Sequence, residues 1–174
     1  MAEASVTGFA AYGLLYLSVV TGIGLSSPWG RRRLVRLRIA GSHETLSLAG
    51  LALAALHAFG SVPAFEFAWL LPPLAPSPGM AYGAAGLDAF AVVTLTFYLR
   101  RRVGAPLWRW LHTLAYVGFA FAAVHGIVMG ANAWTGTVQV LYAATLVTAG
   151  GLAALRAVEA VRLRRRRLRA GAGA

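Results

Sequence analysis

The sequence contains no cysteine, its basic residues are all arginine, and only five of its 174 residues are acidic. The absence of cysteine excludes disulfides, iron–sulfur clusters, thiolate metal sites and the covalent attachment of c-type haem. Sixteen arginines and five acidic residues give the chain a net charge of +11. In a soluble protein this charge would suggest a nucleic-acid partner, but no nucleic-acid-binding motif accompanies it, and we expect none.

Hydrophobic residues make up 59% of the chain, too many for an ordinary soluble domain. A bilayer-spanning helix needs about 20 apolar residues, and five runs reach that length. They cover residues 6–25, 39–61, 80–99, 107–130 and 137–157. The sequence therefore predicts an all-α integral membrane protein with about five transmembrane helices. We divide it into an external N-terminus (1–5), a transmembrane domain (6–158) and a basic cytoplasmic tail (159–174).

Fourteen of the sixteen arginines lie in three clusters, within residues 31–38, 100–102 and 162–169. Basic loops stay on the cytoplasmic side of a membrane. Five spans place all three clusters on that side, whereas an even number would scatter them. We therefore expect a multi-pass protein of the inner (plasma) membrane with its N-terminus outside and its C-terminus in the cytoplasm. The segment before the first run has Glu3 but no basic residue, so we interpret this run as a retained helix rather than a secretory signal.

Two further segments fall outside this pattern. Residues 63–79 are apolar but too short and too rich in proline to span, which predicts a re-entrant or surface-lying segment on the external side. The final four residues, GAGA, are expected to be disordered.

All four histidines lie in two of the apolar runs, His43 and His57 in the second, His112 and His125 in the fourth. Ionisable residues at membrane depth are costly and usually functional. Fourteen residues separate the first two, which on a helix returns them to nearly the same face, about 21 Å apart. The second two are thirteen apart and roughly 140° out of register on an ideal helix. We therefore expect a kink, a tightened turn or a tilt in the fourth span.

In a five-span topology His43 lies level with His112, and His57 lies level with His125. Two neutral imidazoles from facing helices form an axial ligand set for haem iron. The chain thus predicts two haem sites stacked across the membrane, in a four-helix core. A structural hydrogen bond is the alternative role for His43, which lies beside Glu44 near the membrane boundary.

Gly50 and Gly118 stand midway between the histidines of their runs. Glycine there would keep side chains away from a flat macrocycle, although close packing of two membrane helices would also require it. Arg109, three residues before His112 and on its face, is a candidate partner for haem propionates, as are Arg36 and Arg38. Six aromatic residues are candidate walls of the sites or, alternatively, lipid-facing anchors: Phe59, Trp108, Trp110, Tyr116, Phe119 and Phe121.

These motifs resemble a known family. The stretches SHETLSLAGLALAALH and HTLAYVGFAFAAVH, the entry WRWLH and the ending HGIVMGANAW are similar to the transmembrane domain of the ferric reductase and NADPH oxidase superfamily, over about residues 41–134. The resemblance implies two b-type haems, an inner one on His43 and His112 and an outer one on His57 and His125. The resemblance also implies that these haems pass single electrons across the membrane. With both axial positions filled, no catalytic acid, base or nucleophile is expected.

Complete enzymes of that family carry a cytoplasmic FAD and NAD(P)H domain, but no G-x-G-x-x-G fingerprint occurs in this sequence. We therefore expect an electron-transfer subunit whose donor is a separate cytoplasmic flavin reductase or a membrane quinol. The bacterial haem subunit that feeds methionine sulfoxide reductase, which is similar to this family, works in that way. The external acceptor would be ferric iron, oxygen or a periplasmic reductase.

Two alternatives stay open. The first is a haem-free transporter in which the histidines bind metal ions or relay protons, although only Glu44 lies near them and Asp88 is the sole acidic residue in another span. The second is a quinol-linked cytochrome of the b561 kind that acts alone. The arginine tail is expected to anchor the topology and favour anionic lipid, with docking of an acidic redox partner as the alternative.

Overall fold

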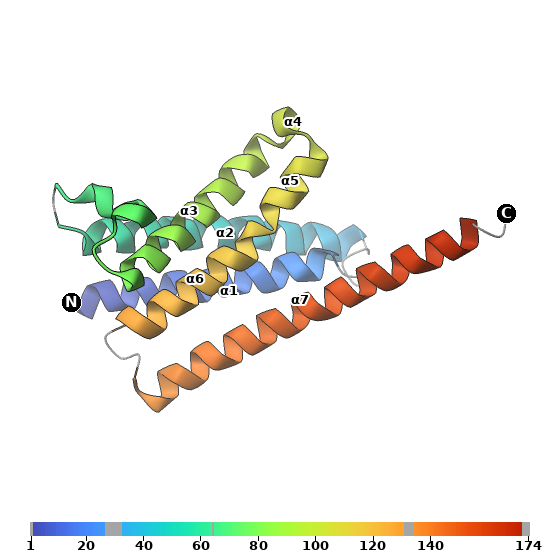
Figure 1. Ribbon diagram of the computed structural model, residues 1–174. Coiled ribbons are helices and arrows are strands. Elements are labelled where there is room, and N and C mark those ends of the chain that lie inside the picture. Colours follow the sequence, from blue (N-terminus) through green and yellow to red (C-terminus); the bar gives the residue numbers. More distant parts are fainter. Residues whose placement is uncertain (1, 27–32, 64, 131–133, 172–174) are drawn as a thin grey trace.

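The computed structural model describes residues 2–26, 33–63, 65–130 and 134–171, and these residues form helices and short turns without a strand. Five helical segments are long and apolar enough to cross a membrane. They are α1 (Ala2–Ser26), α2 (Arg33–Ser61), α3 (Pro78–Tyr98), the pair α5 (Ala105–His112) and α6 (Leu114–Met129), and α7 (Gly136–Gly171) (Figure 1). The predicted all-α membrane architecture with five spans is confirmed.

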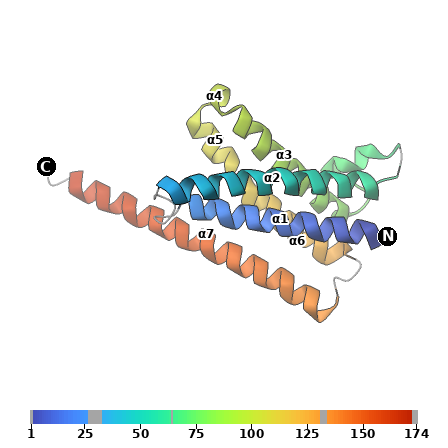
Figure 2. The ribbon, with the colours of Figure 1, turned by 180° about the vertical axis from the view of Figure 1, so that it is seen from behind.

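The spans form two antiparallel pairs and one long additional helix. Helix α1 packs along α2, and α3 packs along α6, while α7 contacts α1 and α6 (Figures 1 and 2). The buried core lies where α1 meets α3, α6 and α7. Its members are Tyr12, Leu15, Val19, Ile23, Phe90, Phe119, Ala123, Tyr142 and Ala149.

Hydroxyl groups set how α7 lies against α1. The hydroxyls of Tyr12 and Thr145 are 2.6 Å apart, and those of Tyr16 and Thr148 are 2.8 Å apart. Hydroxyl groups in apolar surroundings are costly unless paired. These bonds therefore favour one parallel register of the two helices, in which partners differ by 132 or 133 positions.

The fourth span is broken next to its first histidine. Helix α5 ends at His112 and α6 begins at Leu114. Around Thr113 the backbone makes i→i+3 bonds: Thr113 N donates to Trp110 O at 3.0 Å, and Tyr116 N donates to Thr113 O at 3.1 Å. Such a turn advances each residue by about 120° rather than 100°. It therefore moves His125 toward the face of His112, and the predicted tightened turn is confirmed.

The segment after α2 lies on the surface of the bundle, which is one of the two arrangements predicted for it. It forms two short 3₁₀ turns, η2 (Phe67–Leu70) and η3 (Pro72–Leu74), which rest against α3 and contain no buried residue. The side chain of Phe65, just before them, is 97% exposed. The described part of residues 63–77 thus lies on the bundle and does not enter it, whereas Pro78 and Gly79 already belong to α3 and Gly79 is buried.

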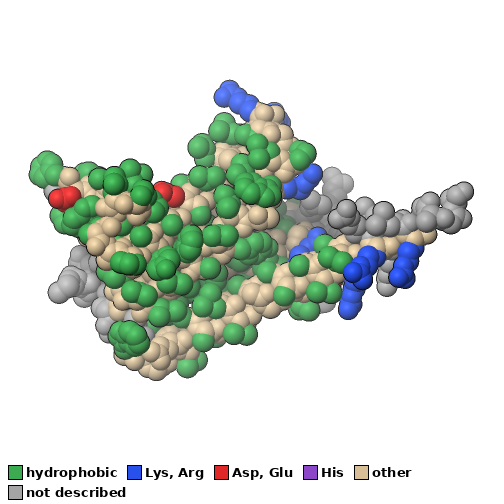
Figure 3. Space-filling view, in the orientation of Figure 1, with side chains coloured by type: hydrophobic (Ala, Val, Ile, Leu, Met, Phe, Trp, Pro, Cys, Tyr) green, Lys and Arg blue, Asp and Glu red, His purple; other side chains and the backbone are tan. Residues whose placement is uncertain are grey.

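The basic segment after residue 158 is helical. It continues α7 to Gly171, because arginine, alanine and leucine all favour helix and no proline interrupts them. In Figure 3 the arginines with described side chains gather at one end of the molecule. The remaining GAGA residues, 172–174, lie outside the described residues, as do Arg31 and Arg32.

Candidate functional site

The structure brings the four histidines together in the two predicted pairs. The ring centroids of His43 and His112 are 6.1 Å apart at an interplanar angle of 74°, and those of His57 and His125 are 6.1 Å apart at 67°. A metal–imidazole bond is about 2 Å long, so two imidazoles on opposite sides of one metal ion have centroids about 6 Å apart. Both pairs therefore have the separation that a bis-histidine iron requires.

The helices that carry the paired histidines are held apart. Helix α2 packs on α1 and α3, and α6 packs chiefly on α3, but α2 has no extended backbone contact with α5 or α6. Opposing histidine rings therefore face each other across a gap between helices. A flat group can lie between two rings only if the helices that carry them leave such a gap.

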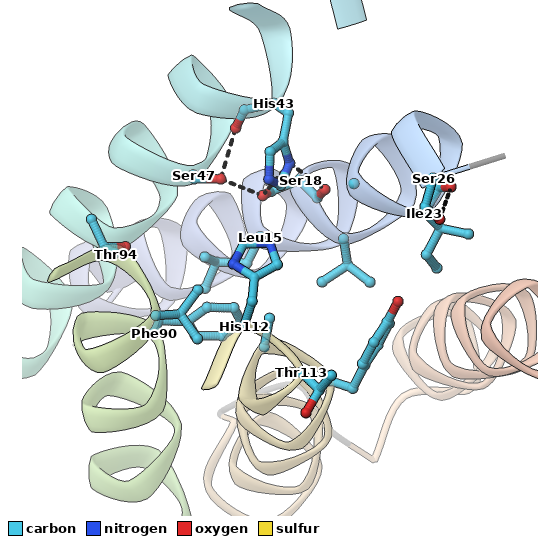
Figure 4. Close-up of a pocket in the computed structure, with 15 residues that line it drawn as sticks. Leu15, Ser18, Ile23, Ser26, His43, Ser47, Phe90, Thr94, His112 and Thr113 are labelled. Atoms are coloured by element: carbon cyan, nitrogen blue, oxygen red, sulfur yellow. Dashed lines mark hydrogen bonds between the residues drawn. The ribbon is translucent and has the colours of Figure 1, made fainter. Parts of the chain in front are cut away.

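At the inner pair this gap is a cavity of about 170 Å³. In Figure 4, His43 from α2 and His112 from α5 project toward each other across it, with Leu15 and Phe90 on its apolar side. Its volume is below the roughly 300–1,000 Å³ usual for small-molecule sites. A tetrapyrrole would therefore fill the cavity and protrude past its mouth.

Backbone carbonyls orient two of the rings. The Nδ1–H of His43 donates to the carbonyl of Ser18 at 2.9 Å, and the Nδ1–H of His125 donates to the carbonyl of Gly79 at 2.8 Å. A histidine held in this way presents its other nitrogen, Nε2, as a neutral metal ligand. Sequence reasoning did not identify either carbonyl, because each comes from another helix.

His112, unlike His43 and His125, is not held by a backbone carbonyl among the described residues. Its Nδ1 is buried without a hydrogen-bond partner in the described part of the chain, and so is Nε1 of Trp108. The two rings lie 5.3 Å apart. Buried polar groups in native proteins are usually paired, so these two atoms leave hydrogen-bonding capacity unused beside the inner pair.

A serine pair links α1 to the first histidine. The hydroxyl of Ser47 donates to the carbonyl of His43 at 2.7 Å and lies 2.6 Å from the hydroxyl of Ser18. The two helices are thereby held at the level of the inner site (Figure 4).

Three glycines that sequence reasoning missed lie against the histidine rings. A Cβ atom on Gly22 would lie 3.0 Å from the ring of His43, and one on Gly8 would lie 3.1 Å from the ring of His57. A Cβ on Gly83 would lie only 2.7 Å from Nδ1 of His125. A sequence signal existed for the first two, because Gly8 and Gly22 have the same fourteen-residue spacing as the histidines of the antiparallel helix.

The two glycines singled out from the sequence have other neighbours. A Cβ on Gly50 would meet Leu15 at 3.0 Å, and a Cβ on Gly118 would meet Ala89 at 3.1 Å. These contacts join α1 to α2 and α3 to α6. They support close helix packing, the alternative that the sequence left open, rather than clearance for a macrocycle.

The predicted arginines with described side chains, Arg38 and Arg109, do not line the inner cavity. Arg109 and Arg38 are exposed, and the side chain of Arg36 lies outside the described residues. On α5 it is Trp108, not Arg109, that lies against His112.

The aromatic residues that were predicted to wall the haem sites lie in different surroundings. Tyr116 lines the inner cavity. Phe119 stacks on Tyr12 in the core, and Phe121 pairs with Tyr82. Trp110 and Phe59 are exposed.

No family model, curated protein or solved structure matches this chain.

The glycines of α1 provide a test of the two-level arrangement. Gly22→Ala should lower ligand occupancy at the inner pair only, and Gly8→Ala at the outer pair only, each several-fold, because the ring must shift by a few tenths of an ångström. Gly13→Ala and Gly24→Ala on the same helix are the controls, since a Cβ there meets nothing within 4 Å. Occupancy is measured as bound haem per chain after titration. Equal effects of all four substitutions would contradict the prediction.

Proposed function

We propose that this chain is a b-type membrane cytochrome that carries single electrons across the bilayer between two bis-histidine haems. The observation that carries the proposal is that both histidine pairs, on different helices and at two levels, have the same 6.1 Å ring separation. A bound haem supplies an iron atom that changes by one electron between its ferric and ferrous states.

The chain's own residues would bind and orient that group. Nε2 of His43 and His112 would bind the inner iron, and Nε2 of His57 and His125 the outer one. The carbonyls of Ser18 and Gly79 hold two of these rings in the required tautomer. Because two histidines of the chain would hold each haem, the group would supply electron transfer rather than binding of a substrate.

The distance between the two sites suits the transfer of electrons across a membrane. Fourteen residues of helix cover about 21 Å, which is most of the roughly 30 Å hydrocarbon core. The arginine-rich end would face the cytoplasm of a plasma membrane. There the donor is a separate flavin reductase or a membrane quinol, and the acceptor outside is ferric iron, oxygen or a periplasmic reductase.

The test is a pyridine haemochrome assay with a reduced-minus-oxidised visible spectrum on detergent-purified protein expressed with ample haem. We expect about two b haems per chain. A colourless protein would refute the proposal. Reduction by a quinol analogue or by a flavin reductase with NAD(P)H would then identify the class of donor.

The alternative of a metal-ion transporter gains no support from the side chains. Within the described ranges, no three histidine, cysteine, aspartate or glutamate residues come together as a metal-ion site. A pair of imidazoles alone leaves a hard or borderline ion short of protein ligands. The histidine pairs therefore favour the cytochrome over a metal-ion carrier.

A further inference from the structure

Helix α7 brings a cation to the inner cavity. Nε of Arg156 donates to the hydroxyl of Ser26 at 2.8 Å. Ser26 lines the cavity together with His43 and His112. Tyr116, another lining residue, lies within electrostatic reach of the same guanidinium. Arg156 therefore stands at the edge of the inner site, although it is distant from both histidines in sequence.

The position of Arg156 follows from the register of α7. Thr145, bonded to Tyr12, lies eleven residues before Arg156, which is about three helical turns and returns to the same face. The Tyr16–Thr148 bond lies between them and holds the same helix pair. The contacts that attach α7 to α1 thus also direct Arg156 toward Ser26.

The guanidinium keeps free hydrogen-bonding capacity. Of its five N–H donors, the one on Nε is bonded to Ser26. Nη1 makes an ion pair with Oε2 of Glu159 at 3.8 Å, which is beyond hydrogen-bond distance. Nη2 has no hydrogen-bond partner among the residues that the structure describes. The Arg156 side chain is 31% exposed, so it is partly desolvated and still accessible.

The residues that line the cavity include no acidic side chain. Because Glu159 makes only the long ion pair, a negative charge bonded to Arg156 from the cavity side would have to come from a ligand. Arginine binds carboxylates through two parallel hydrogen bonds, and such charge-assisted bonds are about twice as strong as neutral ones.

We propose that Arg156, held by Ser26, binds a carboxylate of the tetrapyrrole whose iron is held by His43 and His112. This assignment rests on the proposed function. It gives the arginine of the fifth span the role that the sequence suggested for the exposed Arg109, and it makes α7 part of the inner site.

The experiment compares haem b with its dimethyl ester, which has the same iron and ring but no carboxylates. Protein expressed without haem is reconstituted with either form, and transfer to apomyoglobin is followed over time. In the wild type, two kinetic phases report the two sites. We expect Arg156→Ala to accelerate one phase of haem b loss roughly tenfold, and to leave loss of the ester unchanged.

The controls separate binding from folding. Arg162→Ala removes an exposed arginine from the same helix and should change neither phase. Arg156→Lys should restore part of the retention, because it keeps the charge but not the planar fork. Equal acceleration of haem b and ester by Arg156→Ala, or no acceleration of either, would overturn the assignment and leave the cytochrome proposal intact. Failure of the wild type to bind either form would overturn both.

Discussion

Replacing His57 or His125 by alanine should remove the same one of two haems, and replacing His43 or His112 should remove the other. Each pair is built across a helix gap at 6.1 Å, so loss of one ring leaves the iron with a single axial ligand and an opened site. We expect haem content to fall from about two to about one per chain in every single variant. The measurement is a pyridine haemochrome assay normalised to protein.

The double variants provide the sharper control. Residues in one ligand pair act as a unit, so their effects are not additive. His57→Ala with His125→Ala should therefore keep the haem that either single variant keeps, whereas His43→Ala with His57→Ala should bind none. Loss of the same haem in the His43 and His57 single variants would contradict the pairing. Gly13→Ala, at an open position, serves to check that purification itself does not remove haem.

Gly83→Ala should abolish or strongly weaken haem binding at the outer pair, although it replaces neither His57 nor His125. The new methyl group would lie 2.7 Å from Nδ1 and 2.9 Å from Cε1 of His125, closer than non-bonded atoms approach. The ring would have to move and would lose its bond to the carbonyl of Gly79. Loss of one such bond costs about 1–3 kcal/mol when the donor stays buried, so outer-haem affinity should fall tenfold or more.

This variant is measured by redox titration of the visible spectrum. The wild type should show two one-electron components, and Gly83→Ala should show one, with the inner component unchanged in potential. Gly24→Ala is the matched control, since a Cβ at that position meets no atom of the described residues within 4 Å. Retention of both components in Gly83→Ala with unaltered potentials would refute the role assigned to this glycine.

Much of the architecture could be predicted from the sequence because the underlying rules are local. Span length follows from hydropathy and the fixed rise of the helix, and the described helices agree with the predicted runs to within a few residues in most cases. Residue spacing alone placed His43 and His57 at two levels. The thirteen-residue gap to His125 required a tightened turn, and the backbone makes one at Thr113.

Only the tertiary structure decided which neighbours surround the rings, because those neighbours depend on the register and rotation of helices that are distant in sequence. The Ser18 and Gly79 carbonyls and the close approach of Gly83 arise from such packing.

The same reason explains why the sequence favoured Arg109 while the structure directs Arg156 to the inner cavity. Proximity along one helix is visible in a sequence, but Arg156 reaches Ser26 through bonds between α1 and α7. The sequence by itself determined the spans, the two levels and the candidate ligands. Helix-to-helix packing determined what holds each ligand in place.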